Sequence, residues 1–313
     1  MSKKLSIIIA CYKDAEAIPV MHKRICDLNI ADEIELEIIF VNDGSPDSSQ
    51  MRLLEIAAKD SRVIGIKHTR NFGSQAAFLS GMKISTGDAI VIMDGDLQDP
   101  PEMILDFIQY WHDGYEVVYG IRESREAPIY MQFFYKIFYR IFSKLSSFKV
   151  PKDAGDFSLM DRKVVNFLLS LQEREPFLRA LRAYFGGKSV GVKYRRPERM
   201  FGKSTNSLLS NLGWASKGLV AVSRIPLNLV AGISLITVPI FMGMLILIIL
   251  LNAQIRELII LFNIVLSSLF ILNLVQSSVI AIYLGKVMED TKQRPLFIVD
   301  SIIRNGKEVK VEI

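Results

Sequence analysis

Two carboxylates stand one residue apart in the stretch Asp94-Gly95-Asp96-Leu97-Gln98-Asp99-Pro100-Pro101. The residues just before them, 89–93, are all apolar and predict a buried strand. Carboxylate oxygens at the end of such a strand are ligands that hard divalent cations such as Mg²⁺ and Mn²⁺ prefer, and a cation of this kind commonly holds a diphosphate. A turn with helix caps would use the same residue types without a metal. We take Asp94 and Asp96 as candidate metal ligands, with the turn as the alternative.

Apolar runs alternate with helix-like segments along residues 5–120. Continuous apolar strands separated by helices are typical of an α/β fold whose mostly parallel sheet is covered on both faces. The predicted strands are residues 5–10, 36–41, 63–67, 89–93 and 116–119, and the predicted helices are residues 15–28, 48–59, 74–84 and 102–112.

Polar motifs follow four of these strands. Tyr12 and Asp14 come after the first strand, Asn42-Asp43-Gly44-Ser45 after the second and Arg70-Asn71-Phe72-Gly73 after the third. Right-handed crossovers place the carboxyl ends of parallel strands on one edge, where open α/β sheets bind their ligands. The motifs are therefore expected to meet the Asp94 stretch in one site.

Two stretches near the C-terminal end, residues 227–251 and 258–284, contain no formal charge. Each exceeds the roughly 20 residues that cross a bilayer as a helix. The short linker between them predicts an antiparallel transmembrane hairpin, and a pair of buried core helices is the alternative. Lys and Arg are frequent before the first stretch and after the second, whereas the linker between the stretches has only Arg256. Because positive charge favours the cytoplasmic side, this puts both termini and the soluble domain in the cytoplasm, at the inner (plasma) membrane.

The chain has a net charge of +5 and a hydrophobic content of 50%. Because the basic residues crowd beside the apolar stretches, we expect anionic membrane lipids as partners and no nucleic acid. The only cysteines, Cys11 and Cys26, are expected to be free thiols in a cytosolic domain.

Two further segments have a composition that favours the bilayer interface. About residues 129–147 combine aromatic residues at helical spacing with the basic stripe Lys136, Arg140 and Lys144, and about residues 207–224 contain Trp214. Both are expected to be interfacial amphipathic helices. For the first, an ordinary helix packed on the sheet is the alternative. In the tail, residues 297–303 and 308–313 are expected to pair as strands and to support oligomers.

These motifs together resemble those of the family 2, GT-A fold glycosyltransferases, and within them the polyprenyl-phosphate glycosyltransferases. The resemblance covers nearly the whole chain and includes Gly155-Asp156-Phe157 and Arg294-Pro295-Leu296. It implies a GT-A domain with its interfacial helices at residues 1–225, the hairpin at 226–285 and a cytoplasmic tail at 286–313. The Gln-x-x-Arg-Trp motif of the processive polysaccharide synthases is absent from the sequence, which favours transfer of a single sugar.

The resemblance also implies roles for individual residues. Tyr12, Asp14 and Asp43 would line the nucleotide pocket. Asp94 and Asp96 would flank the metal and the donor diphosphate, with Gln98 on the sugar side. Asp96 and Asp156 are the predicted catalytic residues. The candidates for binding the acceptor phosphate are Arg122, Arg196, Arg199, Lys203 and Ser204.

The sequence departs from the pattern of that family in three places. The usual Pro-x-Tyr-Asn-Glu at the start reads Ala10-Cys11-Tyr12-Lys13-Asp14. An arginine commonly follows Gly-Asp-Phe, and Ser158 stands there instead. The usual Gly-x-Ser-Lys-Tyr reads Gly202-Lys203-Ser204-Thr205-Asn206. The sequence thus leaves the ligands of the acceptor phosphate open, and Arg196 and Arg199 could instead form a solvated basic face or headgroup anchors.

The expected activity is an inverting, metal-dependent transfer of one sugar from a nucleotide-diphosphate sugar, such as a UDP-sugar, to undecaprenyl phosphate. The resemblance implies a homo-oligomer, with four copies. The alternatives are transfer to another lipid or polymer acceptor, and a catalytically silent, membrane-anchored assembly protein. Because every predicted donor residue precedes residue 100, the donor site is expected to form without the hairpin or the tail.

Overall fold

The computed structural model describes residues 3–122, 151, 154–171, 173, 176–197, 200, 223, 225–250 and 255–311. The predicted interfacial helix at 129–147, and that at 207–224 apart from residue 223, lie outside this part of the chain. So do three of the predicted phosphate ligands, Arg199, Lys203 and Ser204.

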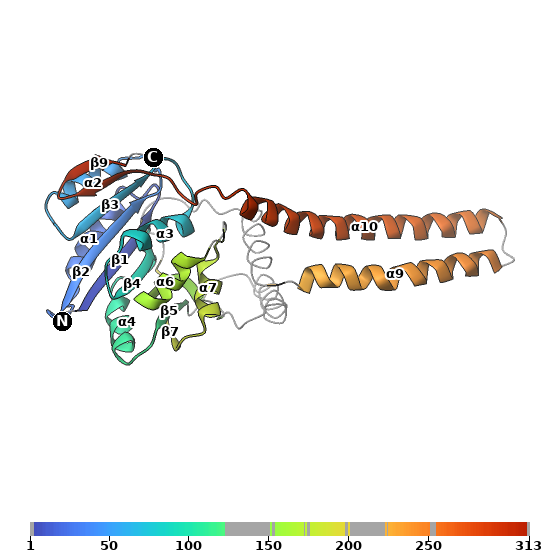
Figure 1. Ribbon diagram of the computed structural model, residues 1–313, viewed down its shortest axis with the longest axis horizontal. Helices are drawn as coiled ribbons and strands as arrows, with labels where there is room; N and C mark the ends of the chain where they lie inside the picture. Colours follow the sequence, from blue (N-terminus) through green and yellow to red (C-terminus); the bar gives the residue numbers. More distant parts are fainter. Residues whose placement is uncertain are drawn as a thin grey trace.

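The first 120 residues form the predicted alternation of strands and helices (Figure 1). Strands β1, β2, β3 and β4 run parallel to one another in the order β4-β1-β2-β3. The nine elements of this region, all at predicted positions, are β1 (Lys3–Cys11), α1 (Ala17–Cys26), β2 (Ile34–Asn42), α2 (Ser49–Ala57), β3 (Val63–His68), α3 (Ser74–Ile84), β4 (Ala89–Asp94), α4 (Met103–His112) and β5 (Val117–Arg122).

The sheet is buried on both faces because its central strands carry apolar residues at successive positions. In β1, Ile7 and Ile9 pack with α1, α2 and α4, whereas Ile8 packs with α3 and its neighbours on the opposite face. All three isoleucines are fully buried, and each such burial contributes about 1.5–3 kcal/mol. These two layers of helices fix the edge on which the strands end.

Four later elements complete this half of the domain: β6 (Ala154–Asp161), α6 (Arg162–Ser170), α7 (Leu178–Phe185) and β7 (Ser189–Tyr194). Strand β6 inserts between β4 and β5 and runs antiparallel to both. These four elements were not among the predicted ones. Their effect is to bring Gly155-Asp156-Phe157 beside the end of β4.

The C-terminal tail joins the same sheet. Strand β8 (Val299–Arg304) pairs antiparallel with β3 and with β9 (Lys307–Lys310), so the sheet order is β7-β5-β6-β4-β1-β2-β3-β8-β9. Figure 1 shows this red hairpin beside the blue strands. Ile303 of β8 is fully buried in the core. The pairing of the two tail strands confirms the prediction, but the tail is built into the catalytic sheet rather than standing apart from it.

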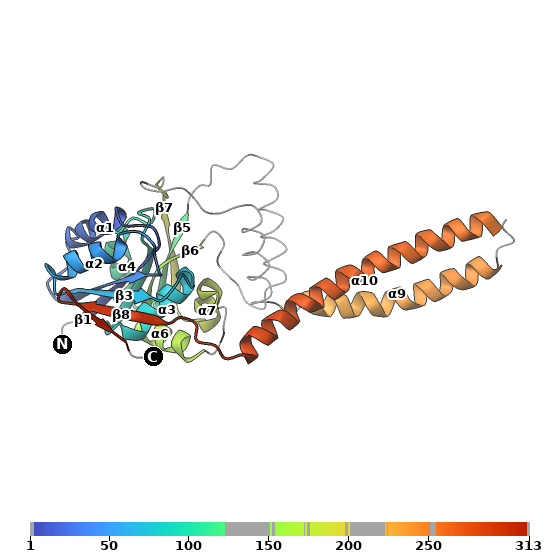
Figure 2. The ribbon, with the colours of Figure 1, turned by 90° about the horizontal axis from the view of Figure 1, so that it is seen from above.

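Two long helices, α9 (Ile225–Leu250) and α10 (Ile255–Thr291), lie side by side and project away from the sheet (Figures 1 and 2). Both are long and apolar enough to cross a membrane, with mean hydropathy of 2.0 and 2.6 in the candidate spans Ile225–Met244 and Glu257–Thr291. The 37 residues of α10 extend about 55 Å, more than the ~30 Å hydrocarbon core. The helix is thus longer than a single span requires, and its polar last turns lie at the end nearer the sheet domain.

Candidate active site

The loops that follow β1 and β4 touch each other at the carboxyl edge of the sheet. The Gly95 N–H donates to the Ala10 carbonyl at 2.8 Å. A Cβ at Gly95 would lie only 2.9 Å from that carbonyl oxygen and 3.3 Å from Asp14 Oδ2. Glycine is therefore required between the two carboxylates, and its presence lets Asp14 approach them.

Both loops also contain a non-glycine residue in the left-handed region. Lys13 has a φ of 61° and Leu97 a φ of 62°. Such backbone is rare for residues with a side chain and gathers at binding and catalytic sites. Burial of the Leu97 side chain, which is 2% exposed, holds the second loop in place.

Four carboxylates, those of Asp94, Asp96, Asp99 and Asp156, share this edge. Asp96 is 6% exposed and Asp99 1% exposed. Burial, together with the charges of Asp99, Asp96 and Asp156, raises the pKa of Asp94 to about 8. Crowded carboxylates oppose one another's ionisation, and a hard divalent cation relieves this repulsion. The donor set therefore fits Mg²⁺ or Mn²⁺.

Arg196 and Gln98 tie the carboxylate loop to the segment after β7. The Gln98 N–H donates to Asp96 Oδ1 at 3.1 Å, and the Gln98 side-chain amide donates to the Pro197 carbonyl at 3.2 Å. Arg196 NH2 lies 3.9 Å from Asp96 Oδ2. The buried Arg196 Nε has no hydrogen-bond partner among the described residues, so it can donate to a bound anion.

Arg122 reaches the same edge through a buried tyrosine. Arg122 Nε donates to the Tyr194 hydroxyl at 3.3 Å, and that hydroxyl donates to Asp99 Oδ1 at 2.7 Å. Burial and the charge of Asp99 raise the pKa of Tyr194, so its hydroxyl stays a proton donor. Arg122 also passes Gly155, where a Cβ would lie 3.2 Å from the guanidinium. The predicted phosphate ligand is thus beside the Asp156 motif.

Asp156 is held by arginines that the sequence analysis missed. Arg179 of α7 donates to both carboxylate oxygens, with Nε 3.2 Å from Oδ1 and NH2 3.1 Å from Oδ2. Burial raises the pKa of Asp156, but the Arg179 charge and hydrogen bonds bring it below its usual value. Asp156 is therefore ionised at neutral pH and both of its oxygens accept hydrogen bonds.

Arg182, one turn further along α7, supplies a cation at Ser158. Its NH1 donates to Ser158 Oγ at 2.7 Å, and its NH2 donates to the Gly155 carbonyl at 2.6 Å. In the family that the motifs resemble, an arginine commonly stands where this chain has Ser158. Here Arg182 brings a guanidinium to that place from another element. The only signal in the sequence was Leu-Arg-Ala-Leu-Arg-Ala at 178–183, which reads equally as an amphipathic surface helix.

Asp43, unlike the four crowded carboxylates, is surrounded by hydrogen-bond donors of the protein. It is 3% exposed, and it accepts hydrogen bonds from the backbone N–H groups of Phe72 and Gly73 at 2.9 and 2.7 Å. His68 Nδ1 lies 2.8 Å from Asp43 Oδ1. Asp43 thus holds the Arg70-Asn71-Phe72-Gly73 loop against the end of β2. Its predicted contact with a nucleotide stays a prediction.

Tyr12 presents its ring at the rim. It is 38% exposed, and its N–H donates to Asp14 Oδ2 at 2.9 Å. The Lys13 N–H donates to Ser45 Oγ at 2.8 Å, and Ser45 Oγ donates to Asp47 Oδ1 at 2.6 Å. These bonds join the loops after β1 and β2, so the exposed ring stands on a fixed backbone.

The segment that follows α10 packs under the Asp43 loop. Phe297 stacks on His68, with ring centroids 5.5 Å apart and an interplanar angle of 10°. The Thr69 N–H donates to the Ile298 carbonyl at 3.0 Å. His68 is fully buried, and its Nε2 lies 2.9 Å from Ser80 Oγ. The end of the hairpin is thereby connected to the donor edge.

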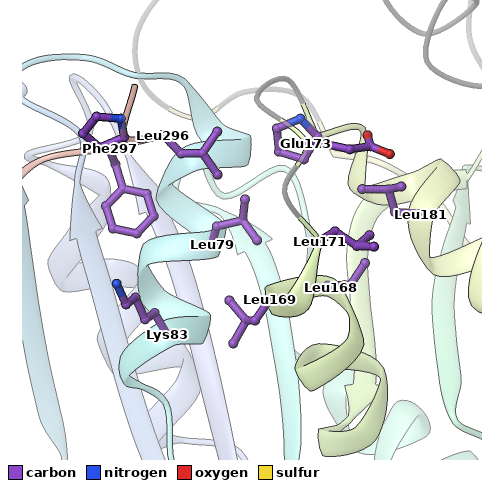
Figure 3. A pocket seen from close by; sticks show the side chains of 11 residues that line it. Leu79, Lys83, Leu168, Leu169, Leu171, Glu173, Leu181, Leu296 and Phe297 are labelled. Atoms are coloured by element: carbon purple, nitrogen blue, oxygen red, sulfur yellow. The ribbon is translucent and has the colours of Figure 1, made fainter. Parts of the chain in front are cut away.

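Phe297 also lines a pocket of about 310 Å³ between α3 and the α6–α7 region (Figure 3). Figure 3 shows Leu79 on one wall, facing Leu168 and Leu171 on the other. The lining is mostly apolar, with Lys83 and Glu173 as its charged members. None of the predicted site residues lines this pocket, so it is separate from the carboxylate edge.

The structure therefore gathers Asp14, the Asp94 stretch, Asp156, Arg122 and Arg196 at one edge of the sheet. Tyr12 lies on the neighbouring loop of that edge. Asp43 is at the same edge but is buried among protein donors. Arg199, Lys203 and Ser204 are outside the described residues, and their positions remain predictions.

Comparison with known proteins identifies the family. The model described as glycosyl transferase family 2 matches residues 6–169. Uncharacterized glycosyltransferase YkcC of Bacillus subtilis is 37% identical, over 94% of this chain and 92% of that protein. The bactoprenol glucosyl transferase of Shigella phage SfX is 30% identical, over 95% of this chain and 99% of that protein. The prophage bactoprenol glucosyl transferase homolog of Escherichia coli K12 is also 30% identical, over 96% and 99%.

Among solved structures, a mannosyltransferase from Pyrobaculum calidifontis in complex with GDP-Man and Mn²⁺ matches 94% of this chain and 89% of its own, with a TM-score of 0.46 and 13% identity. The family match alone spans more than half of the chain, and the sequence relatives extend through the two long helices to the tail strands. The resemblance inferred from the motifs is thereby confirmed, and the chain belongs to glycosyl transferase family 2.

Proposed function

We propose that this protein transfers a single sugar from a nucleotide-diphosphate sugar, of the UDP-sugar class, to undecaprenyl phosphate. The observation that carries the proposal is the pairing of a crowded carboxylate edge with nearby guanidinium groups, in a domain joined directly to two long apolar helices. A phosphorylated donor needs the carboxylate edge with its guanidinium groups, and a lipid acceptor needs the two apolar helices. Relatives named bactoprenol glucosyl transferase match nearly the full length of this chain, which supports the same acceptor.

Asp94 and Asp96 are the residues proposed to hold Mg²⁺ or Mn²⁺. Either cation, when bound, would supply Lewis acidity that neutralises the diphosphate leaving group. Asp14 stands on the adjacent loop and Tyr12 offers an exposed ring to a nucleobase. Gln98, which follows Asp96 in the same loop, is proposed to lie beside the sugar of the donor.

Arg122 and Arg196 are proposed to bind phosphate oxygens. Guanidinium groups stay charged and donate two parallel hydrogen bonds, which suits a phosphate. The unused Arg196 Nε supports this assignment. Arg199, Lys203 and Ser204 are proposed to complete the acceptor site.

Asp156 is proposed to act through its charge rather than as a base. Its oxygens already accept two hydrogen bonds from Arg179, and its lowered pKa makes it a poor proton acceptor. The acceptor phosphate monoester is largely a dianion at pH 7, so it can attack the anomeric carbon without losing a proton. An ionised Asp156 would stabilise the positive charge that develops on the sugar. Direct attack from the opposite side inverts the anomeric centre.

The hairpin is proposed to anchor the carboxylate edge at the cytoplasmic face of the inner membrane, with both termini in the cytoplasm. The excess of Lys and Arg outside the two spans supports this orientation. Several copies would assemble in the membrane. Mass photometry of the detergent-solubilised protein measures their number.

The test is a transfer assay with the purified full-length protein, Mn²⁺ and undecaprenyl phosphate. Radiolabelled UDP-glucose, UDP-N-acetylglucosamine and GDP-mannose are offered separately. We expect one donor to give an organic-extractable product whose anomeric configuration is opposite to that of the donor. Chelation of the metal should abolish the product, and added Mg²⁺ or Mn²⁺ should restore it.

Undecaprenol, which lacks the phosphate, is the matched control and should accept no sugar. Transfer to diacylglycerol but not to undecaprenyl phosphate would assign a different lipid acceptor. Nucleotide binding without transfer to any acceptor would favour an assembly protein.

A further inference from the structure

A cluster of three potential metal ligands lies away from the carboxylate edge. His22 and Cys26 stand one turn apart on α1, and Asp60 lies in the loop between α2 and β3. Helix α1 starts after the carboxyl end of β1 and runs back toward the start of β2. Cys26 ends that helix, and Asp60 shortly precedes Val63, the first residue of β3. The cluster therefore sits at the opposite edge of the sheet from the candidate active site.

The three ligand atoms form a triangle of the size that a tetrahedral zinc ion demands. His22 Nε2 lies 3.0 Å from Asp60 Oδ2 and 3.4 Å from Cys26 Sγ, and Cys26 Sγ lies 3.7 Å from Asp60 Oδ2. Bonds of about 2.3 Å to sulfur and about 2.0–2.1 Å to nitrogen and oxygen, at tetrahedral angles, separate the ligand atoms by roughly 3.3–3.6 Å. Shifts of a few tenths of an ångström would seat the ion.

The chemistry of the set favours zinc over the hard cations of the other edge. A thiolate is a soft ligand and an imidazole a borderline one, and neither suits Mg²⁺. His22 and Cys26 are spaced i, i+4 on one helix face, which holds their ligand atoms together without help from a distant element. Asp60 then adds a ligand from a second element, so a bound ion would tie α1 to the loop that enters β3.

Arg62 supports the two anionic ligands from outside the triangle. Its NH2 donates to Cys26 Sγ at 3.2 Å and to Asp60 Oδ2 at 2.8 Å, and its Nε donates to Asp60 Oδ1 at 2.9 Å. The Arg62 side chain is 46% exposed, so its outer nitrogen can move aside for an incoming ion while Nε stays beside Asp60 Oδ1. Hydrogen bonds of this kind orient ligating groups.

We propose that His22, Cys26 and Asp60 form a zinc site, with a water as the fourth ligand, that stabilises the amino-terminal edge of the sheet and takes no part in sugar transfer. The same three contacts also make a hydrogen-bond network that needs no metal. The experiment must therefore distinguish an ion bound through sulfur from hydrogen bonds alone.

The probe is Co²⁺, titrated into full-length protein that has been stripped with a chelator and desalted, with excess Mg²⁺ present to occupy the carboxylate edge. Cobalt bound by a thiolate gives a sulfur-to-metal charge-transfer band in the near ultraviolet, and oxygen ligands cannot produce it. We expect a band that saturates at one equivalent and disappears when Zn²⁺ is added. Cys26→Ser should abolish it. His22→Gln should weaken binding by about tenfold or more.

Cys11→Ala is the matched control, because Cys11 is the only other cysteine of the chain. This variant should keep the band. Thermal unfolding provides a second readout: Zn²⁺ should raise the Tm of the wild type and of Cys11→Ala but not that of Cys26→Ser. If Cys26→Ser does not fold, His22→Gln and Asp60→Asn take its place in both measurements. Absence of a saturable band in the wild type, or its survival in Cys26→Ser, would overturn the proposal.

Discussion

Asp43 follows β2 and Asp94 ends β4, the two strands on either side of β1, yet their surroundings differ. Asp43 accepts hydrogen bonds from two backbone N–H groups, and His68 Nδ1 lies 2.8 Å from its Oδ1. Protein groups therefore compensate its charge. Burial, together with the charges of Asp99, Asp96 and Asp156, raises the pKa of Asp94 to about 8. A compensated carboxylate can organise the fold by itself, whereas a crowded one needs a cation. Asp43 therefore serves the architecture of the fold, and Asp94 is the aspartate for which we propose a metal.

The largest expected effect follows removal of the charge of Asp96, one of the four crowded carboxylates. We expect Asp96→Asn to lower turnover by about two to three orders of magnitude, because a metal ligand is lost where the leaving-group charge develops. Tm should change little, since the substitution relieves repulsion. Turnover and Mn²⁺ titration measure this effect. Asp106→Asn, an exposed change on α4 of the same domain, is the control. Normal metal-dependent turnover of Asp96→Asn would remove the metal assignment.

Asp43→Asn should affect stability as well as donor binding. The amide has only one acceptor oxygen, so it cannot serve Phe72, Gly73 and His68 together. Leaving a buried donor unpaired costs about 1–3 kcal/mol. We expect a lower Tm and a donor KM raised by about tenfold, with unchanged Mn²⁺ affinity at saturating donor. A variant with wild-type Tm but weakened Mn²⁺ binding would erase the distinction between the two aspartates.

The metal-free protein should lose stability as pH rises toward 8. Asp94 has a folded pKa of about 8, far above the ordinary value of 3.8, so the folded state binds the extra proton between these values. Its contribution to the free energy of unfolding is therefore present at low pH and lost as pH approaches 8. The measurement is the difference in Tm between wild type and Asp94→Asn from pH 5 to pH 8, without metal. Saturating Mn²⁺ should remove the loss, because the ion favours the ionised carboxylate. A pH-independent difference without metal would contradict the crowding argument.

The strands and the residues that follow them could be predicted from the sequence. The strands β1–β4 are uninterrupted apolar runs, and the polar residues after them were placed correctly because parallel strands end on one edge. The neighbouring Asp96 and Asp99 mark Asp94 in the sequence, but nothing local shows which donors surround Asp43 or that Asp156 approaches Asp94. Their environments are decided by Phe72, Gly73 and His68 on one side, and by Asp99 and Asp156 on the other.

The features that the sequence did not predict arise from contacts between residues far apart in the chain. Arg182 meets Ser158 across 24 residues, and β8 meets β3 across more than 200. Neither contact leaves a period or motif in the chain. The tail strands were expected to pair with each other and to support oligomers, and the donor site was expected to form without them. Since Ile303 is fully buried in the core, the structure instead makes residues 299–310 part of the sheet.

The smallest expected effect tests whether that tail reaches the compensated aspartate. Phe297 stacks on His68, and His68 contacts Asp43, which holds the loop at Phe72. An aromatic pair contributes about 0.5–1.5 kcal/mol beyond its buried area, which corresponds to roughly a twofold to tenfold change in an equilibrium constant. We expect Phe297→Leu to raise the donor KM within that range and to leave kcat within about twofold. Phe297→Tyr, which keeps the stacked ring, should behave as wild type.

Leu296→Ala supplies the matched control, because Leu296 is the neighbouring residue and lines the same pocket as Phe297. This change removes packing without touching the stacked ring, so it should lower Tm while leaving the donor KM close to that of wild type. Equal increases in KM for Leu296→Ala and Phe297→Leu would mean that the tail contributes only general packing. A loss of kcat in Phe297→Leu at constant KM would place the effect on the chemical step instead. A rise in KM confined to Phe297→Leu would connect the segment after the membrane hairpin to donor binding through Asp43, the aspartate whose charge the protein already compensates.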